Sequence, residues 1–223
     1  MKNNFGNNLP IINLYKKRDL KSKIDTQLLY GDNFKIKKKL KNFSKIKIKM
    51  DGYIGFIKNE NFSDPIKPNF KVSVLKARLY KKPNLKNKLK KFLPYNSQIK
   101  IFERSGKFCK FDKYWIKSSD ILKINTKNKN IFKDIKMFKN IPYKWGGKTF
   151  RGIDCSALVQ IFFKFNNLYC PRDTKDQIKY FKKEKKIKKN SIVFWKGHVA
   201  ICLSKNQLIH AYGPKKKVLF MNI

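Results

Sequence analysis

Acidic residues are scarce in this chain of 223 residues, where 14 Asp and Glu face 55 Lys and Arg, giving a formal net charge of +41. Such a charge would attract a polyanion, for example nucleic acid, an acidic glycan or an anionic membrane. The alternative is compositional, with lysine used wherever a solvated residue is needed. The basic runs are not interleaved with aromatic residues or glycines, so we expect no specific nucleic-acid partner.

Cysteine is scarce as well, and the spacing of the few that occur excludes common motifs. None lies at C-x-x-C spacing, which argues against a zinc site and against a dithiol redox motif, and no cofactor is expected. A reducing compartment is the simpler assumption. The four residues are Cys109, Cys155, Cys170 and Cys202.

Long apolar runs are missing. The apolar patch from Leu9 to Leu14 is too short for a signal peptide or a membrane span. We therefore expect no membrane insertion and a cytoplasmic location, or a periplasmic or secreted one if a longer N-terminus lies upstream. A content of 41% hydrophobic and 14% aromatic residues nevertheless predicts a chain that folds around a core.

The N-terminal half has the pattern of two small β modules. Period-two alternation, broken by turn residues, predicts an antiparallel barrel over residues 1–62, with a hairpin turn and strand at residues 51–57. After a linker at residues 65–68, a second β-rich stretch of similar character predicts another module over residues 63–122.

The remaining residues, 123–223, predict a domain of the α+β class. Helices are expected at residues 131–138 and 154–165, the second burying one face because its apolar residues recur at helical spacing. Short apolar segments then predict an antiparallel sheet, with strands at residues 191–195, 199–203, 207–211 and 218–221.

Cys155 is the candidate nucleophile of this domain. It follows Asp154, a good N-cap, and so begins the predicted helix, where free backbone N–H groups favour negative charge. We expect this position to lower the pKa of the thiol and so supply the attacking thiolate, while the same amides stabilise an oxyanion. For an arbitrary cysteine, a buried structural role is the commoner alternative.

The chain has only two histidines, His198 and His210, at 43 and 55 residues beyond the cysteine and in or beside predicted strands of the same domain. A thiolate needs an imidazole partner, and that imidazole needs a polar group to fix its tautomer. His198 is therefore the candidate base and His210 the residue that orients it.

Five ordered blocks now make the C-terminal domain resemble the NlpC family of cysteine peptidases, and the N-terminal modules resemble bacterial SH3-like barrels, best at residues 26–31 and 51–55. The resemblance implies a papain-like fold, with Cys155, His198 and His210 as the catalytic set and no metal. The blocks are residues 142–147, 152–159, 171–173, 197–201 and 208–211.

The same resemblance implies a substrate site. Tyr143 would lie beside the thiol, and Asp154 and Thr174 would hold a free amino terminus, since a carboxylate pairs with an ammonium group. The alternative is that Asp154 and Thr174 only cap helices. Tyr53 would contribute from the first barrel if that barrel forms a wall of the cleft, although an exposed barrel tyrosine is the commoner outcome.

The function that follows is hydrolysis of short peptidoglycan stem peptides, at the bond between γ-D-Glu and a diamino acid in peptides with free N-terminal L-Ala. One alternative is a non-catalytic protein whose barrels and lysines bind wall polymer or nucleic acid. Another is a thiol acyltransferase or amidase with the same triad, because the triad defines acyl transfer and not the acceptor. Oligomeric state is not determined by the sequence.

Overall fold

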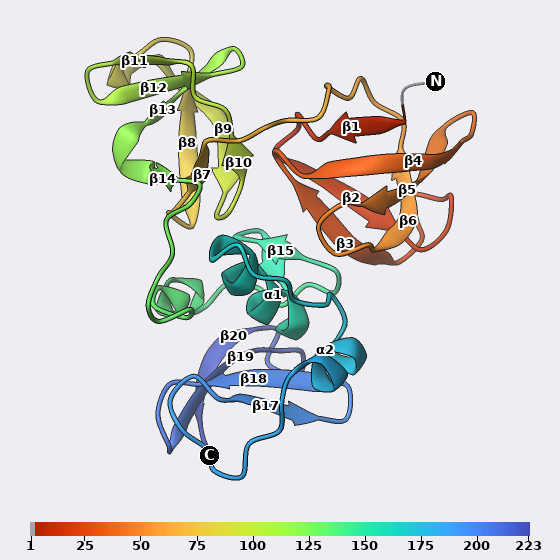
Figure 1. The fold of residues 1–223 in the computed structure, drawn as a ribbon, viewed down its shortest axis with the longest axis vertical. Coiled ribbons are helices and arrows are strands. Elements are labelled where there is room, and N and C mark those ends of the chain that lie inside the picture. Colours follow the sequence, from red (N-terminus) through yellow and green to blue (C-terminus); the bar gives the residue numbers. More distant parts are fainter. Residues whose placement is uncertain (1–2) are drawn as a thin grey trace. The chain divides into compact units, whose positions relative to one another are not determined.

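A computed structural model describes residues 3–223 (Figure 1). The chain forms two compact units, the first ending at Thr126 and the second comprising Lys127–Ile223. Both β modules belong to the first unit. The predicted division into three domains, at residues 62 and 122, stays a prediction.

The first β module is an antiparallel sheet whose strands pair in the order β1-β4-β5-β6-β2-β3. In β5, Ser44, Ile46 and Ile48 are buried while Lys45 and Lys47 are exposed, which is the alternation predicted from the sequence. The predicted hairpin is also present, since β5 pairs with β6 across a turn at residues 49–53. The strand bounds are β1 (Asn4–Gly6), β2 (Ile11–Tyr15), β3 (Ile24–Leu29), β4 (Asn33–Lys39), β5 (Phe43–Ile48) and β6 (Ile54–Lys58).

The second β module consists of two antiparallel sheets, in the orders β10-β7-β14 and β11-β12-β13-β8-β9. Residues of both sheets, among them Val72, Leu79 and Ile116, share one buried core. The bounds are β7 (Phe70–Val72), β8 (Lys76–Tyr80), η1 (Leu85–Asn87), β9 (Lys88–Pro94), β10 (Gln98–Ile99), β11 (Glu103–Ser105), β12 (Phe108–Phe111), β13 (Tyr114–Lys117), η2 (Ser118–Asp120) and β14 (Ile121–Lys123).

A short segment after β3 joins the two modules. Tyr30 packs into the core of the second module, with its ring centroid 5.4 Å from that of Phe111. The backbone N–H of Gln98 donates to the Tyr30 carbonyl over 2.9 Å. The next residue, Gly31, has a φ of +86°, and a Cβ built there would lie 2.0 Å from the carbonyl oxygen of Gln98. Only glycine fits where the two modules meet.

The second unit is an α+β domain, as predicted, with α1 packed on the sheet β17-β18-β19-β20 (Figure 1). All pairings in this sheet are antiparallel. The bounds are η3 (Ile135–Phe138), β15 (Lys148–Thr149), β16 (Gly152–Ile153), α1 (Cys155–Phe165), α2 (Thr174–Tyr180), β17 (Ile192–Trp195), β18 (His198–Cys202), β19 (Gln207–Tyr212) and β20 (Lys217–Asn222). The four predicted strands and the helix at residues 154–165 are thus confirmed.

Two helix predictions need correction. Residues 131–138 do not form an amphipathic α-helix, because only Ile135–Phe138 are helical and they form a 3₁₀ turn. Helix α1 does not bury one face alone: Phe163 is its only residue that is not buried. A helix covered on all sides is held by packing around its whole circumference, which fixes its first residue firmly. Among residues 3–223, no helix is both long and apolar enough to cross a bilayer.

Replacing Gly31 by alanine is expected to destabilise the first unit by about 3 kcal/mol, since a positive φ costs roughly 1–2 kcal/mol and the clash with Gln98 adds a similar amount. Gly106→Ala is the matched control, because Gly106 has a φ of +51° but open space where its Cβ would lie. This control should lose only about 1 kcal/mol. Urea unfolding of both variants measures the difference, and equal losses would contradict the assigned contact.

Candidate active site

Cys155 is the first residue of α1, and the helix begins there for a local reason. The side chain of Asp154 is the N-cap, accepting a hydrogen bond of 2.8 Å from the backbone N–H of Ala157. The cap satisfies one of the free amide donors of the first turn. This capping role was one of the two interpretations of Asp154 from the sequence. The thiol is buried, with 7% of the residue exposed.

The Cys155 sulphur contacts two other elements. Its Sγ lies 3.9 Å from the hydroxyl oxygen of Thr174, at the start of α2. A backbone hydrogen bond from Val199, the residue after His198, also reaches the thiol. The first turn of α1, the start of α2 and the start of β18 therefore converge on one sulphur atom.

The pKa of the Cys155 thiol is raised, first by burial and then by the carboxylate of Asp154. Hydrogen bonds from the backbone of Val199, the hydroxyl of Thr174 and the backbone of Ser156 lower it, but they do not prevail. The sequence-based expectation that the pKa of the Cys155 thiol is lowered is therefore wrong. The physical reason is desolvation, which penalises the thiolate more than the helix-start donors favour it.

The two histidines lie on neighbouring strands and contact each other. Nε2 of His198 is 2.8 Å from Nδ1 of His210, and the ring of Tyr212 stacks on that of His210 with centroids 4.7 Å apart. Because Nε2 of His198 is engaged, Nδ1 is the nitrogen left to act on a substrate or on the thiol. His210 is buried, and its own Nε2 has no hydrogen-bond partner among the described residues.

Both imidazoles are neutral near pH 7. Burial lowers the pKa of His198, and burial together with the nearby His198 ring lowers the pKa of His210 to about 4. If the proton of the shared hydrogen bond belongs to Nε2 of His198, then Nδ1 of His198 carries a lone pair and can accept a proton. This is the tautomer that base catalysis requires.

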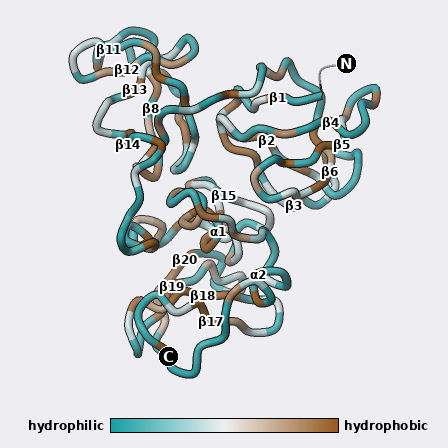
Figure 2. The backbone as a smooth tube through the Cα atoms, viewed as in Figure 1, coloured by the Kyte–Doolittle hydropathy of each residue, from teal (hydrophilic) through white to brown (hydrophobic). Residues whose placement is uncertain are grey.

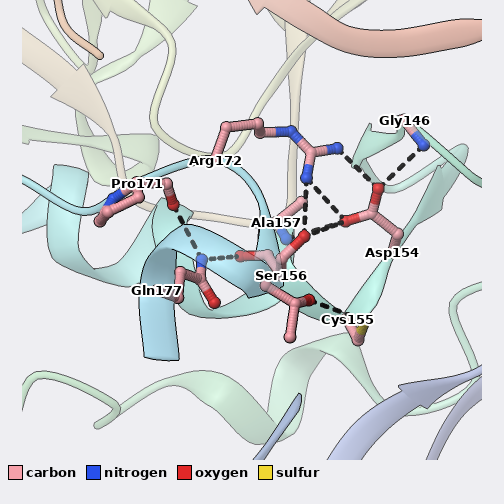
Figure 3. A network of polar contacts seen from close by, with 9 residues as sticks. Gly146, Asp154, Cys155, Ser156, Ala157, Pro171, Arg172 and Gln177 are labelled. Carbon is pink, nitrogen blue, oxygen red and sulfur yellow. Dashed lines mark hydrogen bonds and ion pairs between the residues drawn. The ribbon is translucent and has the colours of Figure 1, made fainter. Parts of the chain in front are cut away.

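Asp154 is held by a buried ion pair (Figure 3). Arg172 donates to both of its carboxylate oxygens, over 2.6 and 3.0 Å, and also to the hydroxyl of Ser156 over 2.8 Å. The backbone N–H of Gly146 adds a further hydrogen bond of 2.8 Å to Oδ2. Both carboxylate oxygens thus already accept bonds from protein donors, while the predicted contact with a substrate amine stays a prediction.

Tyr143 and Thr174 lie near the thiol, and Tyr53 belongs to the other unit. Burial, followed by the charges of Cys155 and Asp154, raises the pKa of Tyr143 to about 12, so its hydroxyl keeps its proton and can donate. Thr174 is the first residue of α2 and does not cap it, because Asp173 is the N-cap. Tyr53 packs against the core of the first β module. Its predicted contact with substrate stays a prediction.

Several residues that shape the site received no role from the sequence. Arg172 lies in the block of residues 171–173, but no local pattern indicates its ion pair, because its partner Asp154 lies 18 residues earlier in the chain. Gln177 is fully buried and donates to the carbonyl oxygens of Ser156 and Pro171 over 2.9 Å, tying α2 to α1. The part of the chain that the structure describes contains no group of three or more His, Cys, Asp or Glu side chains placed to hold a metal ion.

Two family models match the chain. One, described as the NlpC/P60 family, matches residues 140–222, and the other, described as the bacterial dipeptidyl-peptidase Sh3 domain, matches residues 14–62.

Curated relatives match at modest identity. A gamma-D-glutamyl-L-lysine dipeptidyl-peptidase of Bacillus cereus is 24% identical over 88% of this chain and 70% of its own length. Dipeptidyl-peptidase 6 of Lysinibacillus sphaericus is 36% identical over 31% of this chain, and the match spans only 27% of that relative.

A solved structure has the same fold along almost the whole chain. It is an NlpC/P60 family protein from Bacillus cereus, with a TM-score of 0.85 and 18% sequence identity, matched over 98% of this chain and 94% of that one. The family models, the curated relatives and the Cys155 environment agree: the chain carries an NlpC/P60 domain at residues 140–222, preceded by a bacterial dipeptidyl-peptidase Sh3 domain at residues 14–62.

Proposed function

We propose that this chain is a cysteine peptidase that hydrolyses short peptidoglycan stem peptides, with Cys155 as nucleophile, His198 as base and His210 as the residue that orients the base. The observation that carries the proposal is the convergence of three elements on the Cys155 sulphur, one of them at Val199, the residue that follows His198. His198 is in turn joined to His210 by a hydrogen bond of 2.8 Å. The names of the relatives, a gamma-D-glutamyl-L-lysine dipeptidyl-peptidase among them, support the substrate class.

The reaction starts from a neutral pair. As the sulphur attacks the carbonyl carbon, the thiol proton passes to Nδ1 of His198, which becomes an imidazolium ion hydrogen-bonded to His210. The C–N bond then breaks, the leaving amine takes the proton from His198, and an acyl-enzyme remains. Water then attacks the thioester and gives a proton to His198. The C–S bond breaks, the acid product is released, and the Cys155 sulphur takes the proton back from His198.

The oxyanion is stabilised at the start of α1. The backbone N–H groups of the first turn can donate to the negative charge that develops on the carbonyl oxygen of the substrate. The positive end of the helix dipole favours the same charge. The protonated hydroxyl of Tyr143 is a further donor close to the thiol. These donors favour the transition state over the neutral substrate carbonyl.

The finer proposal is cleavage between γ-D-Glu and the diamino acid in peptides with a free N-terminal L-Ala. Thr174 and Asp154 are the groups proposed to meet that amino terminus. Arg172 already balances the charge of Asp154. The carboxylate would therefore serve the ammonium group mainly as a hydrogen-bond acceptor and only weakly as an opposite charge. The half-buried hydroxyl of Thr174, beside the sulphur, is the other partner of the ammonium group in this scheme.

Cys155→Ala is expected to lower kcat/KM on L-Ala-γ-D-Glu-L-Lys by at least about a thousandfold, since removing a nucleophile leaves only residual stabilisation by the site. Cys202→Ala is the matched control, because Cys202 is also a buried cysteine of the same unit but takes no part in the proposed reaction. Its activity should stay within about threefold of the parent. The activity of each variant is measured as release of lysine by mass spectrometry. A wild-type chain that is inactive on every stem peptide would overturn the proposal.

The pH dependence follows from the directions of the pKa shifts. The thiol pKa is raised above its ordinary value of 9.0, so alkylation of Cys155 by iodoacetamide should keep accelerating with pH up to at least pH 9. The His198 pKa is lowered below 6.5, so His198 stays an unprotonated base down to that pH and kcat/KM should fall only below it. Peptide mass mapping follows the alkylation. A flat alkylation rate between pH 4 and 8 would instead reveal a resting ion pair.

Thr174→Val is expected to lower kcat/KM about tenfold more on a stem peptide with a free amino terminus than on the same peptide acetylated, because only the free amine uses the hydroxyl. Thr174→Ser keeps the hydroxyl and should retain the preference of the parent. Equal losses on both peptides would assign Thr174 to the thiol alone, through the 3.9 Å contact, and remove it from amine binding.

A further inference from the structure

A cavity of about 590 Å³ lies in the C-terminal unit between the end of α2 and the start of β17. Its lining comes from α1, from α2, from β17 and from the segment of residues 181–191 that connects them. Cys155, His198 and His210 are not among the lining residues. The volume falls within the range of small-molecule sites in proteins, about 300–1,000 Å³. The proposed peptidase reaction makes no use of this space.

The floor of the cavity is aromatic and aliphatic. The ring of Phe181 lies 5.0 Å from that of Phe163 and 6.4 Å from that of Phe194, measured between centroids, and all three line the cavity. Ile178 and Ile187 also belong to the apolar lining, yet they remain 47% and 42% exposed. Apolar surface of this extent is thus still open to solvent inside a concave site.

The rim of the cavity is cationic. Six lysines line it against one acidic residue, Glu184, and all seven are exposed. Glu184 pairs with Lys188 over 3.5 Å. In Figure 2 the segment between α2 and β17 is a hydrophilic stretch. The lysines are Lys182, Lys183, Lys185, Lys186, Lys188 and Lys189.

An apolar floor beneath a cationic rim is complementary to a ligand with two matching parts. A polyanion alone would leave the floor exposed to water, and a neutral apolar ligand would make no use of the lysines. A second copy of this chain carries the same net charge of +41 and would be repelled. A molecule with an apolar chain and an anionic end satisfies both surfaces.

We propose that this cavity binds an anionic amphiphile, a single apolar chain that ends in a phosphate or carboxylate group. The chain lies on the Phe163, Phe181 and Phe194 rings, and the anionic group is held by the lysines of residues 182–189. The ligand enters as a single molecule and not as part of a bilayer surface. Its binding is independent of the proposed peptidase activity.

The test is calorimetric titration of the full chain with dodecyl phosphate below its micelle-forming concentration. The chain carries Cys155→Ala, so the result does not depend on catalysis. Dodecyl phosphate is expected to bind at least about tenfold more tightly than either inorganic phosphate or dodecyl maltoside, because each control lacks one of the two complementary parts. Equal affinity for either control would overturn the proposal.

Paired variants locate the site. Lys183→Gln with Lys186→Gln should weaken binding by about tenfold at low salt, whereas Lys215→Gln with Lys217→Gln makes the same charge change outside the cavity and should leave affinity within about twofold. Ile187→Ser should weaken binding, whereas Leu168→Ser, at a residue 43% exposed and absent from the lining, should not.

Three results would overturn the proposal. The first is an equal loss of affinity in both members of either pair of variants. The second is flotation with phosphatidylglycerol vesicles in the absence of any binding of the monomer, which would indicate a membrane surface. The third is displacement of dodecyl phosphate by a single-stranded oligonucleotide with undiminished affinity in Ile187→Ser, which would indicate a polyanion site that does not use the apolar floor.

Discussion

The buried ion pair between Asp154 and Arg172 determines where the thiol lies. Asp154 caps α1, so its carboxylate sets the residue at which the helix begins, and Arg172 holds that carboxylate from the segment before α2. Removing one partner of such a pair typically costs about 3–5 kcal/mol, because the other charge is left buried and uncompensated. Gln177 of α2 adds neutral hydrogen bonds to the Ser156 carbonyl in α1 and to the Pro171 carbonyl in the segment before α2. The result is a rigid base for the first turn of α1, from which Cys155 meets Thr174 and the backbone of Val199.

The same burial that makes the site rigid also sets its resting protonation state. It raises the pKa of the Cys155 thiol and lowers the pKa values of His198 and His210, so thiol and imidazoles all favour their neutral forms. In the proposed mechanism, charge therefore appears only as the proton moves from sulphur to Nδ1 of His198. The donors at the start of α1 stabilise the negative charge that develops on the substrate in the transition state. Stabilisation of the transition state is what accelerates a reaction.

Rigidity recurs in the first unit, at the segment where the two β modules meet. Tyr30 belongs to the chain of the first module but is buried in the core of the second, and Gly31 leaves no room for a side chain beside Gln98. Because aromatic burial and a backbone hydrogen bond act at the same place, the two modules form one compact unit. The second unit, by contrast, combines its rigid site with an exposed lysine-rich segment over an apolar cavity.

Local pattern in the sequence was sufficient to predict much of this protein. Alternation predicted the strands around Ile46, short apolar segments predicted the sheet that carries His198 and His210, and helical spacing with an N-cap predicted α1. Those features depend on neighbours along the chain, which is why they can be read from it. The pKa of Cys155, the ion pair of Asp154 with Arg172 and the cavity beneath residues 182–189 could not be read in this way. Each depends on desolvation and on side chains distant in sequence, so only the tertiary structure decided them.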